Sequence, residues 1–228
     1  MSTDQVYRTE LSPVSFLKRS AYVFPDKIAV IHGQRRYTYA EFQVRVNRLA
    51  SALANVGVKK HDRVAFLSPN TPALLEAHYA VPAAGGVLVA INTRLSSGEI
   101  EYILEHSGAS ILFVDDQLYA GIQNLDLSGL EVINISDTGR ADDPYEIFLQ
   151  TGSPDAVRDV LEDEEEPISM NYTSGTTGRP KGVVYSHRGA YLNAMGEAIE
   201  TGMTFDSIYL WTLPMFHCNG WCFTWAVT

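Results

Sequence analysis

Short apolar runs alternate with helix-like segments along the first 135 residues, and this alternation restricts the folds that the chain can adopt. In residues 39–56 the apolar side chains recur at steps of four and three, which is the spacing of one helix face. Apolar runs of strand length occur at residues 27–32, 63–68, 87–91, 110–114 and 130–135. Strands that alternate with helices favour an α/β fold with largely parallel sheets.

Local signals also predict where several elements begin and end. Thr38 with Glu41, and Ser96 with Glu99, have the spacing of capping boxes that begin helices. We expect the helix that begins near residue 72 to be interrupted at Pro82, because proline removes a helical hydrogen bond. Further predicted elements are a short helix up to residue 24, a weak helix over residues 116–124, and strands over residues 168–172, 183–185 and 208–212.

Residues 136–166 have a different composition from the segments on either side. Asp, Gly, Pro and Ser are frequent there, and the stretch ends in the acidic run Glu-Asp-Glu-Glu-Glu at residues 162–166. Acidic runs are usually solvated surface. The 228 residues suffice for one large domain or two small ones. We therefore expect this stretch to be a surface loop that marks a subdomain boundary within residues 1–228.

The charge and the cysteine count exclude several classes of protein. Seventeen Lys and Arg against 27 Asp and Glu give a net charge of −10, which disfavours nucleic-acid binding. Cys218 and Cys222 are too few for a disulfide framework, and with His217 they lack zinc-site spacing. The start of the chain carries no secretory signal, and the apolar residues 208–227 are interrupted by polar ones. We expect a cytoplasmic protein without a membrane span.

Residues 172–182, Tyr-Thr-Ser-Gly-Thr-Thr-Gly-Arg-Pro-Lys-Gly, form the most informative stretch, which we name the Gly/Thr loop. Glycines allow backbone N–H groups to approach a ligand closely, and consecutive N–H groups bind anions. Hydroxyl side chains add donors, and Lys181 adds a compact positive charge. This composition predicts a phosphate-binding loop; the alternative is a plain surface turn.

The Gly/Thr loop differs from a Walker A loop, which runs from a strand into a helix. Here Pro180 precedes the lysine, and the apolar residues 183–185 behind it predict a second strand. The loop therefore joins two strands, and we expect it to close over phosphates when they bind.

The Gly/Thr loop strongly resembles the phosphate loop of the adenylate-forming superfamily, which comprises acyl-CoA synthetases, luciferases and adenylation domains of peptide synthetases. Residues 37–42, 83–94 and 209–221 resemble other motifs of that superfamily. Residues 214–221, Pro-Met-Phe-His-Cys-Asn-Gly-Trp, are most similar to fatty and short-chain acyl-CoA synthetases, including plant-type acyl-activating enzymes and methylmercaptopropionate–CoA ligases. We name residues 214–221 the His217 segment. The resemblance covers essentially the whole chain and implies the front half of the superfamily's large N-terminal domain.

The resemblance implies a two-step reaction. A carboxylate attacks the α-phosphate of ATP and gives acyl-AMP and pyrophosphate, and the thiol of coenzyme A then displaces AMP to give a thioester. Mg²⁺ would bridge phosphate oxygens, with Thr173 as its nearest loop residue, and Lys181 would stabilise the developing charge. The residues that the resemblance places around the ATP phosphates are Thr173, Ser174, Gly175, Thr176, Thr177, Gly178 and Lys181.

The His217 segment is implied to bind the acid. His217 would lie near the carboxylate and act in catalysis with Lys181, while Gly220 and Trp221 would line the acyl site. His217 and Trp221 are four residues apart, so they could face one pocket from a helical turn. The alternative is that His217 is a core histidine and Trp221 packs in the interior. Gly220 and Trp221 favour a short- or medium-chain aliphatic acid over an aryl acid.

Parts of the superfamily pattern are absent from the 228 residues. They contain no Tyr-Gly-x-Thr-Glu motif, no later ribose-binding Asp and no C-terminal subdomain with its lysine. We therefore expect a truncated chain that is inactive by itself. The alternatives are a non-catalytic nucleotide- or partner-binding remnant, and adenylation without transfer to coenzyme A. The implied partners are a small carboxylic acid, ATP and coenzyme A, with a homodimer left open.

Overall fold

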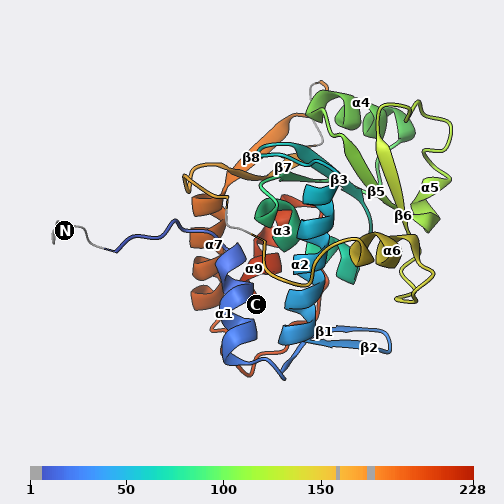
Figure 1. Cartoon of the computed structure of the whole chain (residues 1–228). Coiled ribbons are helices and arrows are strands. Elements are labelled where there is room, and N and C mark those ends of the chain that lie inside the picture. The colour runs from blue at the N-terminus through green and yellow to red at the C-terminus, as the bar shows by residue number, and fades with distance from the viewer. Residues whose placement is uncertain (1–6, 158–159, 174–177) are drawn as a thin grey trace, which may run out of the picture.

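The computed structural model describes residues 7–157, 160–173 and 178–228 (Figure 1). The helices are α1 (Val14–Val23), α2 (Tyr39–Asn55), α3 (Pro72–Ala83), α4 (Ser97–Ser107), α5 (Asp116–Tyr119), α6 (Pro144–Gln150), α7 (His187–Glu200), α8 (Cys218–Trp221) and α9 (Phe223–Ala226). The strands are β1 (Ile28–His32), β2 (Arg35–Thr38), β3 (Arg63–Leu67), β4 (Val87–Ala90), β5 (Ile111–Asp115), β6 (Glu131–Ile135), β7 (Pro167–Tyr172) and β8 (Gly182–Ser186).

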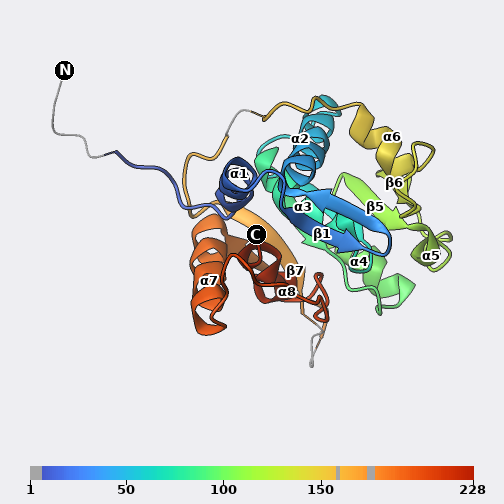
Figure 2. The same ribbon diagram turned by 90° about the horizontal axis from the view of Figure 1, so that it is seen from below.

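A six-stranded sheet in the order β6-β5-β3-β4-β7-β8 forms the centre of the molecule. All neighbouring pairs are parallel except β7 and β8, which are antiparallel. Strands β1 and β2 form a separate antiparallel hairpin beside α2 (Figure 2). The prediction of an α/β fold with a largely parallel sheet is confirmed, because the central strands are too apolar to expose either face.

Helices cover both faces of the sheet. On one face, α2, α3 and α6 pack against β3 and β5 around Phe66 and Phe113, whose rings stack at 4.4 Å between centroids. On the other face, α4 packs against alternate residues of the same strands, such as Ala65 and Leu112. Because successive strand residues point to opposite faces, one apolar run supplies both cores.

The two predicted capping boxes are confirmed. Thr38 accepts from the backbone N–H of Glu41, whose carboxylate accepts from Thr38 N–H. In the second box the carboxylate of Glu99 accepts from both the backbone N–H and the hydroxyl of Ser96, at 2.9 and 2.7 Å. The prediction that the helix is interrupted at Pro82 is wrong. Helix α3 continues through Pro82 and ends one residue later, because the carbonyl of His78, which Pro82 leaves without a helical donor, accepts from the indole N–H of Trp225.

Two further expectations differ from the structure. Residues 208–212 form no strand, and this stretch is largely exposed, with Ile208 at 92% and Leu210 at 83% of full exposure. An apolar run alone could not distinguish a sheet strand from an unpaired segment. Within the expected loop 136–166, Asp143 caps the short helix α6, which packs on α2. The predicted weak helix near residue 116 is only four residues long.

Among the described residues, no helix combines the length and the apolar character needed to cross a bilayer.

Candidate functional site

The carboxyl ends of β3, β4 and β7 lie side by side, because the three strands are parallel neighbours. The chain leaves β3 for α3 on one face of the sheet and leaves β4 for α4 on the other. Such a reversal opens a crevice at the carboxyl ends of the strands, where α/β proteins bind ligands. The Gly/Thr loop follows β7, so the chain order brings this loop to that edge of the sheet.

At the base of the Gly/Thr loop, β7 and β8 pair as a short antiparallel ladder. Tyr172 pairs with Gly182, and the backbone N–H of Thr173 donates to the carbonyl of Lys181 at 3.0 Å. The loop therefore joins two strands, as predicted. Thr173, Gly178 and Lys181 are exposed. The other four candidate phosphate contacts, Ser174, Gly175, Thr176 and Thr177, lie outside the described residues.

Helix α4 contacts the chain on both sides of the Gly/Thr loop, at Tyr172 and at Arg179. The hydroxyl of Tyr172 lies 2.8 Å from Nδ1 of His106, and the guanidinium of Arg179 lies over the ring of Tyr102, 5.3 Å from its centroid. Burial raises the pKa of Tyr172 above its ordinary value, so the hydroxyl stays protonated near neutral pH. Sequence reasoning did not single out Tyr102 or His106, because helix periodicity shows which face packs but not which distant loop it meets.

The His217 segment is a series of tight turns and not a regular helix. The backbone N–H of His217 donates to Pro214 at 3.1 Å, and the N–H of Gly220 donates to His217 at 2.9 Å. Positive φ angles at Cys218, Asn219, Gly220, Trp221 and Cys222 break α8 internally. The expectation that His217 and Trp221 share a helical turn is therefore corrected.

His217 and Trp221 are both exposed, with Trp221 at 60% of full exposure. Within the described residues, neither side chain is packed in a core. Gly220 is buried, and a Cβ on it would lie 2.8 Å from the ring of Trp211, so packing favours glycine there.

A buried polar cluster connects the His217 segment to β7. Oδ1 of Asn219 accepts from the hydroxyl of Ser169 at 2.6 Å and from the amide of Asn171. All three residues are buried, and Nδ2 of Asn219 is buried without a hydrogen-bond partner. Asn171 lies two residues before Thr173. The structure thus attaches the His217 segment to the strand that leads into the Gly/Thr loop.

Helix α3 holds the chain that follows the His217 segment. The hydroxyl of Tyr79 donates to the carbonyl of Thr224 at 2.8 Å, and the indole N–H of Trp225 donates to the carbonyl of His78 at 3.1 Å. The rings of His78 and Trp225 meet edge to face, 5.6 Å apart. These contacts are buried, and they fix the position of residues 224 and 225, which follow the His217 segment.

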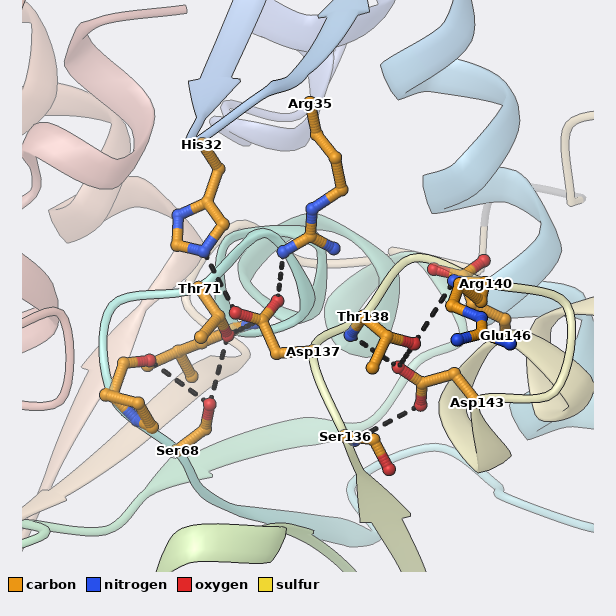
Figure 3. Close-up of polar contacts among 12 residues, drawn as sticks. His32, Arg35, Ser68, Thr71, Ser136, Asp137, Thr138, Arg140, Asp143 and Glu146 are labelled. Atoms are coloured by element: carbon orange, nitrogen blue, oxygen red, sulfur yellow. Dashed lines mark hydrogen bonds and ion pairs between the residues drawn. The ribbon is translucent and has the colours of Figure 1, made fainter.

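A second polar cluster lies beyond the carboxyl ends of β3 and β6 (Figure 3). Asp137, which follows β6, accepts from Arg35 and lies 2.9 Å from Nε2 of His32, so it ties the β1–β2 hairpin to the sheet. Ser68 and Thr71 join their hydroxyls at 3.0 Å within the turn after β3. These partners satisfy one another, which indicates a structural role for the cluster.

No zinc site forms. Cys218 and Cys222 are free thiols, and burial raises the pKa of Cys222 to about 11, so its sulfur stays neutral. Within residues 7–157, 160–173 and 178–228, no group of three or more His, Cys, Asp or Glu side chains could hold a metal ion.

The fold and the position of the loop define an N-terminal domain of the adenylate-forming type. A solved long-chain-fatty-acid–CoA ligase of Archaeoglobus fulgidus matches the structure with a TM-score of 0.85 at 26% identity, covering 97% of this chain and 46% of that one. The inhibitor-bound N-terminal domain of FACL13 from Mycobacterium tuberculosis matches with a TM-score of 0.79 at 28% identity, covering 94% and 54%.

Residues 17–228 match the family described as AMP-binding enzyme, and the chain belongs to this family. An acetate–CoA ligase of Humulus lupulus is 41% identical over 96% of this chain and 42% of its own length. A peroxisomal benzoate–CoA ligase of Arabidopsis thaliana is 44% identical over 95% and 40%. The chain thus spans about two fifths of the length of these curated relatives.

Proposed function

We propose that this chain forms the N-terminal part of an ATP-dependent carboxylic acid–CoA ligase. The observation that carries the proposal is that the His217 segment is hydrogen-bonded through Asn219 to Asn171 of β7, the strand that leads into the Gly/Thr loop. A reaction between ATP and an acid needs both substrates at one place. The relatives that match nearly the whole chain are CoA ligases by name, which supports this choice.

In the first step, a carboxylate oxygen of the acid attacks the α-phosphorus of ATP. The bond between that phosphorus and the bridging oxygen breaks, and pyrophosphate leaves with both electrons of the bond. Lys181 is proposed as the fixed cation that stabilises the charge on the phosphates, and the exposed Thr173 hydroxyl as a ligand of Mg²⁺. Mg²⁺ supplies Lewis-acid polarisation of phosphate oxygens when it is bound.

The remaining loop residues are proposed to line the phosphates. They are Ser174, Gly175, Thr176, Thr177 and Gly178. His217 is proposed to hold the carboxylate beside the α-phosphate, with Gly220 and Trp221 lining the acyl group. In the second step the sulfur of coenzyme A attacks the acyl carbon, and AMP leaves from it.

The acid is proposed to be a short- or medium-chain aliphatic one, with an aryl acid as the competing outcome. The names of the relatives include both classes, acetate and benzoate. The free thiols fit a reducing compartment, and we propose the cytoplasm, although that benzoate–CoA ligase is peroxisomal by name. A second copy of the chain is the candidate macromolecular partner.

Replacement of Lys181 tests the proposed role of the loop. In the protein expressed from the complete reading frame, Lys181→Ala should lower acid-dependent ATP–pyrophosphate exchange by about a hundredfold, because a preorganised charge at the phosphates is lost. Lys59→Ala removes another exposed lysine and should leave the exchange rate unchanged. Equal rates for the Lys181 variant and the wild type would contradict the proposal.

A further inference from the structure

The side-chain amide of Asn70 holds the chain just before His217 at two points. Its Nδ2 donates to the carbonyl of Leu213 at 2.7 Å, and its Oδ1 accepts from the backbone N–H of Met215 at 2.8 Å. These groups flank Pro214, whose ring already fixes φ. The oxygen and the nitrogen of the amide thus both bond one short stretch of backbone, which lies 143 to 145 residues farther along the chain.

The turn that carries Asn70 is itself rigid. Ser68 and Thr71 stand on either side of Asn70 in the chain, and their hydroxyls lie 3.0 Å apart (Figure 3). Both side chains are buried, with exposures of 0% and 4%. Thr71 also caps α3 through the N–H of Leu74. The amide of Asn70 therefore projects from a fixed point at the carboxyl end of β3.

We name the two hydrogen bonds of Asn70 the Asn70 clamp. Further hydrogen bonds connect this clamp to the candidate acid-binding residue. The carbonyl of Pro214 accepts from the backbone N–H of His217, and the carbonyl of His217 accepts from Gly220. His217 is exposed, and Nδ1 of its ring lies 3.1 Å from Sγ of its neighbour Cys218. The position of the imidazole thus depends on the backbone that Asn70 holds.

We propose that Asn70 is a positioning residue for the acid, which sets the place of His217 through the backbone on both sides of Pro214. This inference rests on the function proposed above. It separates Asn70 from the contacts farther along the chain, because Asn219, Thr224 and Trp225 are held by β7 and α3 independently of it. Loss of Asn70 should therefore loosen residues 213–217 and leave the rest of the fold in place.

Tryptophan fluorescence tests the clamp without any activity. Of the three tryptophans of the 228 residues, Trp211 donates its indole N–H to the carbonyl of Leu213, which Asn70 also binds, so its share of the emission reports on the region that Asn70 holds. Asn70→Ala should shift the emission to the red and increase quenching by acrylamide, with unchanged far-UV circular dichroism. Asn55→Ala removes an amide that bonds Thr151, and it should change neither signal.

A second variant separates the two hydrogen bonds. Asn70→Asp keeps an acceptor for Met215 N–H but faces the carbonyl of Leu213 with an oxygen, so it should loosen the segment at least as much as Asn70→Ala. If Asn70→Ala fails to fold, Asn70→Ser, which keeps a hydroxyl in the turn, takes its place in both measurements. Unchanged fluorescence in these variants would overturn the clamp.

Kinetics test the functional part in the protein from the complete reading frame. Asn70→Ala should raise KM for the acid about tenfold while KM for ATP stays within about twofold, because two hydrogen bonds that place the acid site are lost. Equal changes in both constants would mean a general structural role and overturn the proposal. A wild-type protein without acid-dependent turnover would overturn the proposed function, while the fluorescence result would still decide the clamp.

Discussion

His78 is a fully buried histidine whose ring makes a single strong hydrogen bond. Its Nδ1 lies 2.7 Å from the carbonyl of Leu74, one turn earlier in α3, and its Nε2 has no hydrogen-bond partner. Burial lowers the pKa of His78 to about 4, so the ring is neutral at pH 7. In the neutral ring Nδ1 carries the proton and donates, and Nε2 carries a lone pair. The ring therefore packs in the interior without a buried charge.

This histidine should make the fold sensitive to mild acid. The unfolded state binds a proton near pH 6.5 and the folded state only near pH 4, so stability is complete above pH 6.5 and falls as the pH drops to 4. The contribution is about 3 kcal/mol over that range. His78→Phe should flatten this part of the pH profile in urea unfolding, whereas the exposed His61→Phe should keep it. Parallel profiles for wild type and His78→Phe would contradict the assignment.

Single residues of the site were predictable to different degrees. Gly, Thr and Lys between two strands marked the Gly/Thr loop, because anion binding needs a local composition that the sequence displays. Asn70 and Asn219 carried no such signal. Their roles arise from contacts across 48 to 145 residues of chain, and a lone asparagine after a strand is an ordinary turn residue.

At the scale of elements, an ion-pair network joins α2, α3 and α6. Arg45 donates to Glu76 at 2.6 Å and to Glu146 at 2.7 Å, and the hydroxyl of Tyr145 donates to Glu76 at 2.7 Å. Glu76 is fully buried. Burial raises the pKa of Glu76, while Arg45 and Tyr145 favour its charged form. Removal of Glu76 would leave the largely buried Arg45 with one carboxylate instead of two, and the buried hydroxyl of Tyr145 without its acceptor.

Glu76→Ala should therefore lower the free energy of unfolding by about 3–5 kcal/mol, because Arg45 keeps only Glu146 as a partner. The control is Glu162→Ala, which removes a pair between Lys60 and a carboxylate that is 82% exposed, and which should leave stability near that of the wild type. Urea unfolding followed by circular dichroism measures both variants. A loss for Glu76→Ala no larger than that for Glu162→Ala would show that the network is not stabilising.

Elements with strong local signals were predicted well. The capped helices α2 and α4 and the buried strands β3, β4 and β5 follow from periodicity and caps that lie within a few residues. Helix α6 was missed because its Asp143-Pro144 start is equally typical of a turn. Residues 208–212 were predicted wrongly because an apolar run indicates burial, while this stretch finds no neighbouring strand among the described residues.

At the scale of the whole molecule, the sheet order could not be read from the sequence. Strand β5 crosses back beside β3, and β7 joins the opposite side next to β4, so β4 lies between β3, which leads to Asn70, and β7, which leads to the Gly/Thr loop. Neither pairing has a local signal. The predicted subdomain boundary near residues 136–166 stays a prediction, although β7, which follows it, continues the same sheet.

The central claim is that this chain is part of an enzyme that activates a carboxylic acid with ATP and transfers it to coenzyme A. The most direct test incubates the protein from the complete reading frame with ATP, Mg²⁺, coenzyme A and acetate, butyrate, octanoate or benzoate in separate reactions. Mass spectrometry then measures the products. We expect an acyl-CoA and an equal amount of AMP, with the largest yield of both from an aliphatic acid. AMP and acyl-adenylate without thioester, or no acid-dependent product from any of these acids, would contradict it.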